Sequence, residues 1–270
     1  MLEIKNLTHV YGDGFKALDD INLRVEAGEL VSIVGPSGCG KSTLMRCIAG
    51  LQRPTGGEVV MDGNRLEGVP GNLAVVFQDY SRSLFPWLTV RDNVGLPLRR
   101  HRLGRSARRG EALRALESVG LADAAQKYPW QLSGGMQQRV AIARSLAYKP
   151  RLMLMDEPFG SVDAQTREDL EDLLLRVRGH GDMTILLVTH DIDESVYVGD
   201  RVVVLTRSPG HVCEDLPVDL PAERDQVGTR ETPAFVHLRA EVGRLIRGDT
   251  PPPQAFPAPS ATPVNRAEES

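Results

Sequence analysis

Cysteine is scarce in this chain, whose 270 residues contain only Cys39, Cys47 and Cys213. None belongs to a Cys-x-x-Cys pair, so the sequence argues against a disulfide framework and a cysteine-type metal site, and it favours a reducing compartment. Apolar runs long enough to cross a bilayer are lacking too, and the first residues carry no signal-peptide pattern. We therefore expect a cytoplasmic protein that takes part in any membrane process through a partner.

Net positive charge is also lacking. The formal net charge is −4 at pH 7, which gives no electrostatic reason to expect a nucleic-acid partner. Basic residues nevertheless gather in residues 99–114, where seven arginines and His101 are opposed by Glu111 alone. Two interpretations stay open: a solvated helix face, which we favour, or a surface that contacts anionic lipid headgroups or an acidic partner.

The most informative motif that the chain does contain is a phosphate-binding pattern. Residues 35–43 read Gly-Pro-Ser-Gly-Cys-Gly-Lys-Ser-Thr, which fits Gly-x-x-x-x-Gly-Lys-Ser/Thr at every fixed position. Glycines let backbone N–H groups point inward at an anion, and the helix expected at residues 43–49 adds the positive end of its dipole. Lys41 is then placed to reach the outer phosphates of a nucleotide, and Ser42 to offer its hydroxyl to Mg²⁺. The alternative is a glycine-rich turn before a helix.

Four short apolar runs show the weak polar alternation that is typical of buried parallel strands; they are residues 31–34, 73–77, 152–155 and 185–188. Each run leads into residues with chemical potential, which are Gly35, Gln78, the pair Asp156 and Glu157, and His190. In an open parallel sheet, ligands bind just beyond the carboxyl ends of the strands. The sequence therefore predicts that these four places, distant along the chain, converge on one nucleotide.

The rest of the chain divides by its patterns. Partial period-two alternation with turn residues between the runs predicts an antiparallel sheet from residues 2–10, 18–25 and 58–62. Residues 89–148 read mainly as helix, with Thr89 as the N-cap of a helix at residues 90–98 and a second helix at residues 106–119. Helical spacing also predicts helices at residues 167–178 and 233–247, and two more strands fall within residues 201–216.

A second motif, Leu-Ser-Gly-Gly-Met-Gln-Gln-Arg at residues 132–139, opens a helix at residues 140–147. Ser133 is a good N-cap, and Gly134 and Gly135 expose backbone amides there, although an ordinary helix start has the same features. Taken together, residues 35–43, 132–139, 152–158 and His190 resemble the ATP-binding subunits of ABC transporters. The resemblance covers roughly residues 1–247.

The resemblance implies an α/β fold: a P-loop NTPase of the ABC ATPase type with a mixed central sheet, an N-terminal antiparallel β subdomain and an inserted helical subdomain. The ABC ATP-binding domain would span residues 1–247, with the helical subdomain at about residues 89–148 and a C-terminal extension at about residues 211–247. Residues 248–270 are rich in proline and polar residues, and we expect them to form a disordered tail.

Carried over position by position, the resemblance implies an ATPase that uses ATP and Mg²⁺. Tyr11 would stack on the adenine ring, and Glu157 would polarise the attacking water. The catalytic residues would be Glu157, His190, Gln78 and Lys41, and the metal ligands Ser42, Gln78 and Asp156. The nucleotide contacts would be Tyr11, Gly35, Pro36, Ser37, Gly38, Cys39, Gly40, Lys41, Ser42, Thr43, Gln78, Ser133, Gly134, Gly135 and Asp163. Each of these residues also has a simpler interpretation when taken singly. Tyr11 could be a half-buried residue at a strand end, and Gln78 a polar residue that ends a strand. Asp156 and Glu157 could lie in a solvated turn, and His190 could be a structural histidine.

The resemblance further implies partners. The chain would form a homodimer or pair with another ATPase subunit head to tail, so that Ser133 caps the ATP held by the second copy and Asp163 links the two sites. Two transmembrane permease subunits would dock near the apolar residues Leu84, Phe85, Trp87 and Leu88, unless these pack internally. An extracytoplasmic solute-binding protein would act indirectly, no nucleic acid would bind, and the chain would lie peripherally at the cytoplasmic face of the inner (plasma) membrane.

Within the superfamily, residues 77–90, 155–160 and 207–221 look most like importer subunits of the nitrate/sulfonate/taurine group. Ser161 and Val162 replace the Ala-Leu usual there and leave Asp163 in place. We therefore expect a subunit that binds and hydrolyses ATP to power import of nitrate, an aliphatic sulfonate, taurine or a related small solute. The alternatives are an ABC ATPase that drives export or lipid trafficking, an ATPase acting on DNA or ribosomes, and a nucleotide sensor without turnover.

Overall fold

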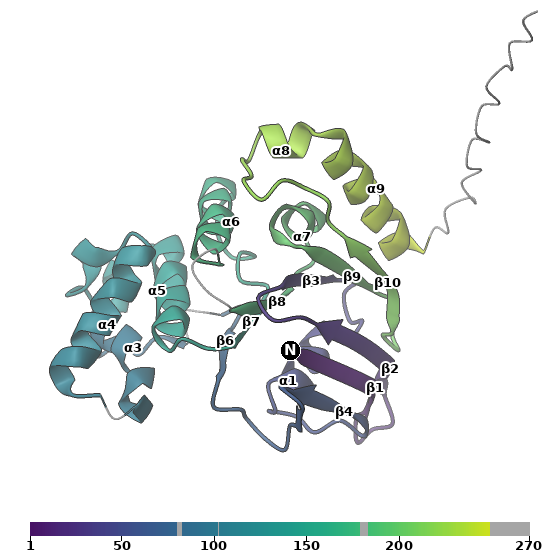
Figure 1. The fold of residues 1–270 in the computed structure, drawn as a ribbon, viewed down its shortest axis with the longest axis horizontal. Coiled ribbons are helices and arrows are strands. Elements are labelled where there is room, and N and C mark those ends of the chain that lie inside the picture. The colour runs from purple at the N-terminus through teal and green to yellow at the C-terminus, as the bar shows by residue number, and fades with distance from the viewer. Residues whose placement is uncertain (80–82, 102, 179–182, 249–270) are drawn as a thin grey trace, which may run out of the picture.

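The computed structural model describes residues 1–79, 83–101, 103–178 and 183–248. These residues form a four-stranded sheet, a six-stranded sheet and the helices around them (Figure 1). The expected disordered tail at residues 248–270 lies, from residue 249 onward, outside the described residues. Across the described ranges, no helix combines the length and the apolar character that crossing a membrane requires.

The six-stranded sheet has the order β10-β9-β3-β8-β7-β6. Its strands are β3 (Leu30–Val34), β6 (Leu73–Val76), β7 (Leu152–Asp156), β8 (Thr184–Val188), β9 (Arg201–Leu205) and β10 (Val212–Pro217). All neighbours pair in parallel except β10, which runs antiparallel to β9. β3 and β8 are buried along their whole length, as expected for parallel strands covered on both faces. The predicted mixed central sheet is thereby confirmed.

The second sheet is antiparallel and has the order β2-β1-β4-β5. It comprises β1 (Leu2–Val10), β2 (Lys16–Val25), β4 (Gly56–Met61) and the short β5 (Asn64–Arg65). This sheet and α1 (Lys41–Ile48) pack against one face of the central sheet. Their apolar side chains form one cluster with those of the central strands, which includes Leu7, Ile21, Leu44 and Leu186. Alternating burial along β1 and β2 matches this one-sided packing.

A helical region lies at one end of the molecule, at the left of Figure 1. It contains α3 (Val90–Gly95), α4 (Arg105–Ser118) and α5 (Gly134–Ala147), with the 3₁₀ turns η1 (Pro97–His101), η2 (Ala122–Ala124) and η3 (Pro129–Gln131). Thr89 caps α3 as predicted, since its side chain accepts a hydrogen bond from the Asp92 N–H. The single helix predicted at residues 90–98 is wrong: α3 ends at Gly95 and a 3₁₀ turn begins at Pro97, because the ring nitrogen of Pro97 has no N–H with which to continue the helical hydrogen bonds.

The remaining helices cover the other face of the central sheet. They are α6 (Ala164–Arg178), α7 (Ile192–Val198), α8 (Gly228–Glu231) and α9 (Pro233–Arg247). Figure 1 shows α8 and α9 at the outer side of α7, away from the antiparallel sheet. The apolar side chains of α6, α7 and α9 belong to a cluster that also includes residues of α3–α5, so one continuous core joins the helical region to the sheet.

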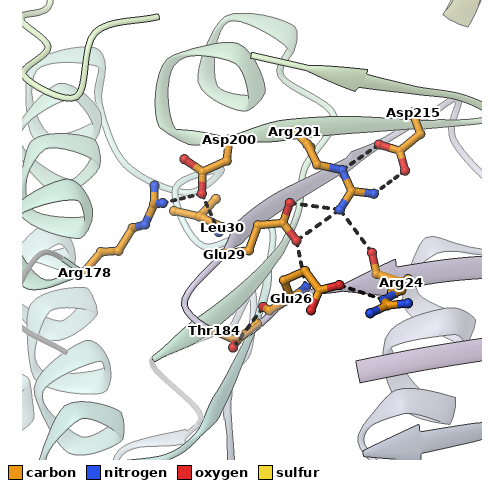
Figure 2. A network of polar contacts seen from close by, with 9 residues as sticks. All are labelled: Arg24, Glu26, Glu29, Leu30, Arg178, Thr184, Asp200, Arg201 and Asp215. Atoms are coloured by element: carbon orange, nitrogen blue, oxygen red, sulfur yellow. Dashed lines mark hydrogen bonds and ion pairs between the residues drawn. The ribbon is translucent and has the colours of Figure 1, made fainter. Parts of the chain in front are cut away.

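A network of charged residues ties the two sheets together (Figure 2). The Arg201 guanidinium donates to both Glu29 oxygens at 2.9 and 3.0 Å and to the Arg24 carbonyl at 3.1 Å. It also forms two hydrogen bonds with the Asp215 carboxylate. Arg201 thus joins β9 and β10 of the central sheet to β2 and to the turn before β3.

Candidate functional site

The phosphate-binding pattern forms a tight loop between β3 and α1. Gly38 and Gly40 have φ angles of 77° and 97°, in the left-handed region that glycine tolerates best. A Cβ on Gly40 would lie 2.6 Å from Leu18 Cδ2 and 2.8 Å from the Ala17 carbonyl oxygen. Glycine is therefore required at this position both by conformation and by space.

Lys41 is the first residue of α1 and is only 7% exposed. Its ammonium donates hydrogen bonds to the carbonyl oxygens of Gly35 at 2.7 Å and Pro36 at 3.1 Å. The loop therefore curls around the ammonium, which places a positive charge at its centre. Within the same motif, Ser37, Gly38 and Ser42 are exposed, whereas Cys39 and Thr43 are buried.

Three predicted residues meet at one carboxylate oxygen. Oε2 of Glu157 accepts a hydrogen bond from Gln78 Nε2 at 3.0 Å and lies 3.1 Å from His190 Nδ1. These residues follow β7, β6 and β8, which are neighbours in the sheet. The predicted convergence at the carboxyl ends of the strands is therefore observed for this trio.

The backbone of Glu157 is unusual because its φ of 43° lies in the left-handed region. Its N–H donates to the Val188 carbonyl at 2.8 Å, and its own carbonyl accepts from Gly160 N–H at 3.2 Å. These bonds hold a conformation that costs energy for a residue other than glycine. Such strained residues concentrate at functional sites.

Asp156, at the end of β7, has a raised pKa, first because it is largely buried and then because the Glu157 carboxylate is adjacent. The positive charges of Arg46 and Lys41 and a hydrogen bond with Ser42 oppose this shift. A bound cation would relieve the repulsion between the two carboxylates. The hydroxyl of Ser42 and the carboxylate of Asp156 are hard oxygen donors, which fits Mg²⁺.

Among the described residues, no group of three or more His, Cys, Asp or Glu side chains could hold a metal ion with protein ligands alone. Mg²⁺ typically takes one or two protein ligands and completes its shell with water and substrate phosphates. The sparse donor set beside the phosphate loop suits that mode of binding.

Tyr11 lies beside the phosphate loop, at the end of β1. Its hydroxyl shares a hydrogen bond of 2.9 Å with Thr43 Oγ1, and this bond is the main cause that lowers the pKa of Tyr11. Its ring stacks on Phe15 with 6.4 Å between centroids and forms a T-shaped pair with the ring of His9. The link between Tyr11 and Thr43 was not foreseen, and stacking of Tyr11 on adenine stays a prediction.

The second motif forms the N-terminus of α5, as predicted. Ser133 is the N-cap, and its hydroxyl accepts from the Met136 N–H at 3.3 Å. Ser133 and Gly134 are exposed, whereas Gly135 packs against Thr166 of α6. The motif is therefore an open helix N-terminus with spare backbone N–H groups.

Asp163 precedes α6 and accepts two hydrogen bonds from Thr166, one from its N–H at 3.0 Å and one from its hydroxyl at 2.7 Å. These bonds lower the pKa of Asp163. An ion pair that the sequence did not indicate lies nearby: Arg167 donates to Asp191, the residue after His190, at 2.9 Å. No spacing signal relates two residues so far apart in the chain.

The apolar residues expected near a permease divide in two. Leu84 is buried and Leu88 is half-buried, so internal packing holds for Leu84 but not for all four residues. Phe85 is 37% and Trp87 70% exposed, and their ring centroids are 5.4 Å apart. Asn93, fully buried, holds this loop by bonding both the N–H and the carbonyl of Phe85.

Comparison with known families agrees with this geometry. Residues 18–160 match the family profile described as ABC transporter. An uncharacterized ABC transporter ATP-binding protein, MJ0412 of Methanocaldococcus jannaschii, is 44% identical over 92% of both chains. The nitrate import ATP-binding protein NrtD of Synechocystis is 42% identical over 92% of this chain and 95% of its own. The bicarbonate transport ATP-binding protein CmpC of Synechocystis is 45% identical, but the match covers 35% of that longer protein.

Solved structures give the same fold. The dimeric post-hydrolysis structure of the ATP-binding cassette MJ0796, bound to ADP and Pi, matches with a TM-score of 0.70 and 36% identity. That match covers 81% of this chain and 99% of the other. CbiO1 of Clostridium perfringens, part of the ABC transporter complex cbiONQ, matches with a TM-score of 0.74 and 29% identity over 80% and 88% of the two chains.

Proposed function

The chain belongs to the ABC transporter family of ATP-hydrolysing cassettes, and on that premise we propose that it powers the import of a small solute such as nitrate, an aliphatic sulfonate or taurine. The observation that carries the catalytic part is the meeting of Gln78 and His190 on one oxygen of Glu157. Similarity to proteins named for nitrate import and bicarbonate transport supports the direction of transport and a small solute.

Lys41 holds the outer phosphates of ATP in this proposal, exchanging the carbonyls of Gly35 and Pro36 for phosphate oxygens. Backbone N–H groups of residues 35–43 bind the phosphates together with the N-terminus of α1. Ser42 and Asp156 hold Mg²⁺, with the Gln78 amide oxygen as a third donor. The bound Mg²⁺ supplies charge neutralisation at the transferred phosphate.

Glu157 orients and polarises the water that attacks the terminal phosphate. Because its Oε2 accepts a hydrogen bond from Gln78 and lies beside His190, the carboxylate has little freedom to rotate. His190, with a mostly exposed side chain, remains able to donate to the terminal phosphate. Gln78 and His190 therefore hold Glu157, the base, in place, and His190 also contacts the terminal phosphate in this proposal.

Two copies, or this chain and a paired ATPase subunit, complete the sites head to tail. The support from this chain is that Ser133 and Gly134 present an anion-binding helix N-terminus to solvent. MJ0796, the similar cassette described above, is dimeric. In the pair, Ser133, Gly134 and Gly135 cap the ATP held by the other subunit, and Asp163 joins the two sites.

Two permease subunits dock on the exposed rings of Phe85 and Trp87, which follow β6 and Gln78 in the chain. Exposed aromatic pairs are costly to leave in water and are enriched at interfaces. An extracytoplasmic solute-binding protein delivers the solute, and the chain stays peripheral at the cytoplasmic face of the inner membrane. We keep residues 89–148 as the helical subdomain and residues 211–247 as the C-terminal extension in this proposal.

The catalytic part is tested with the purified chain and its Glu157→Gln variant. The wild type should hydrolyse Mg-ATP, and the variant should bind ATP, lose about a hundredfold or more in turnover and elute as a dimer in size-exclusion chromatography with light scattering. Turnover near that of the wild type would contradict the role of Glu157.

The transport part is tested by purification of the complex from native membranes. Import predicts a permease pair whose transport depends on a solute-binding protein, with nitrate, a sulfonate or taurine stimulating ATP hydrolysis. A complex that stimulates hydrolysis without any binding protein and moves its solute outward would favour the export alternative.

A further inference from the structure

The first turn of α6 contacts the start of α5 on one side and the residue before α7 on the other. The proposed catalytic steps use neither contact. Asp163 caps this turn through both of its carboxylate oxygens, and Thr166 supplies both donors. Thr166 therefore fixes the rotamer of the residue proposed to link the two ATP sites. The next residue, Arg167, leaves the same turn toward α7.

Thr166 also supports the start of α5. A Cβ built on Gly135 would overlap Cγ2 of Thr166, so the backbone of the second motif rests directly on the threonine methyl group. Arg139 and Asp169 make a second, longer contact between α5 and α6 at 3.4 Å. Thr166 thus donates a hydrogen bond to Asp163 through its hydroxyl and packs against Gly135 through its methyl group.

Arg167 connects this turn to the histidine at the chain's own catalytic centre. Its guanidinium donates to Asp191 Oδ2 at 2.9 Å, and Asp191 Oδ1 caps α7 by accepting from Glu194 N–H at 3.2 Å. The Asp191 N–H donates to Thr189 Oγ1 at 3.0 Å. Asp191 directly follows His190, so a displacement of His190 changes the position of the carboxylate that Arg167 holds.

We propose that Thr166 and Arg167 are positioning residues that join His190 of one ATP site to Asp163 and Gly135, the elements that complete the other site. This inference rests on the proposed function, because it needs two cassettes that face each other. A surface ion pair alone contributes little, but here both carboxylate oxygens of Asp191 and both of Asp163 are engaged, so each side chain has one geometry. The first turn of α6 therefore moves as a unit with α5 on one side and α7 on the other.

A hydrogen bond from His190 to the terminal phosphate would draw His190 toward the nucleotide when ATP binds. Through Asp191 and Arg167 the first turn of α6 follows, and Thr166 carries Asp163 and Gly135 with it. The face presented to the partner therefore depends on whether the chain's own site holds ATP. The expected signature is cooperative ATP hydrolysis that is lost when either contact is removed.

The test uses the full chain with Thr166→Val, which keeps the methyl group and loses the hydroxyl, and with Arg167→Met, which loses the ion pair. Arg176→Met is the matched control, because Arg176 is exposed at the far end of the same helix. Nucleotide affinity of the monomer is measured with fluorescent ADP, and ATP-dependent dimerisation by sedimentation in the Glu157→Gln background. The ATP dependence of hydrolysis in the otherwise wild-type chain gives the Hill coefficient.

Both test variants should bind ADP within about twofold of the wild type, since the phosphate loop is untouched. Their dimerisation should weaken at least about tenfold, the scale for losing a hydrogen bond to a charged group, and the Hill coefficient should fall toward one. Arg167→Lys should recover most of the cooperativity, whereas Thr166→Ser, which keeps the hydroxyl for Asp163 but loses the methyl group that contacts Gly135, should recover part of it. The control should match the wild type.

Dimerisation and cooperativity equal to those of Arg176→Met would overturn the proposal, and so would a loss of ADP affinity as large as the loss of dimerisation. If the test variants unfold, failure of Thr166→Ser and Arg167→Lys to restore cooperativity would count against it as well. Absence of ATP-dependent dimers in the Glu157→Gln chain itself would instead refute the proposed pairing, which separates the two failures.

Discussion

Arg201 offers a quantitative check on how the two sheets are held together. Replacement by glutamine removes the guanidinium that bonds Glu29, Asp215 and the Arg24 carbonyl at the junction in Figure 2. The side chain of Glu29 is 15% exposed and that of Asp215 34%, so both carboxylates would lose their partner where water reaches them only in part. Bonds to charged groups contribute about 1.5–3 kcal/mol each when buried, and exposure reduces this value.

We therefore expect Arg201→Gln to lower the free energy of unfolding by about 2–3 kcal/mol, less than the sum of its bonds because water reaches the site. For a chain of this size, each kcal/mol lowers the melting temperature by about 2–4 °C. Thermal unfolding followed by circular dichroism should thus show a decrease in the melting temperature of about 4–12 °C.

The control lies in the same network. Arg24 pairs with Glu26 at 2.7 Å, but its side chain is 63% exposed. Arg24→Gln keeps the backbone carbonyl that Arg201 uses and should cost less than about 1 kcal/mol. If the two variants melt at the same temperature, the sheets are not joined by Arg201, and apolar packing alone must hold them.

Much of the fold is predictable from the sequence, because parallel strands leave a strong signal. The apolar runs before Gly35, Gln78, Asp156 and His190 correspond to β3, β6, β7 and β8 with shifts of one residue at most. The short α7 was missed, since Asp193, Glu194 and Ser195 give it no continuous apolar face from which to predict a helix. Its stability comes from the Asp191 cap and from packing against α9 and the sheet, which are tertiary effects.

Some contacts of the candidate site could likewise be predicted from the sequence, and others could not. The meeting of Gln78 and His190 at Glu157 follows from the topology of neighbouring parallel strands, although the catalytic roles of these residues stay predictions. The contacts of Thr166 and Arg167 could not be predicted, because they join helices whose relative rotation depends on the whole core. Sequence patterns place a side chain on a face of its own helix, but the partner across the interface comes from three-dimensional packing.

Three further predictions concern nucleotide binding, docking and pH. Lys41→Ala should weaken ATP binding at least about tenfold in fluorescence titration, because it removes the ammonium at the centre of the phosphate loop; unchanged affinity would place the nucleotide elsewhere. Trp87→Ala should reduce recovery of the permease in co-purification without changing the basal ATPase rate of the isolated chain, whereas full recovery would contradict the docking surface. Burial raises the pKa of Glu171 to about 7 despite its partner Arg230. Between pH of about 4.5 and about 7, Glu171 therefore keeps its proton in the folded state and loses it in the unfolded state. Its contribution to the free energy of unfolding is fully present below pH of about 4.5 and is lost as pH rises through about 7. Glu171→Gln should therefore flatten the fall of melting temperature between pH of about 5 and about 7.5, a difference of up to about 3 kcal/mol; parallel pH profiles for the two proteins would show that Glu171 titrates alike in the folded and unfolded chains.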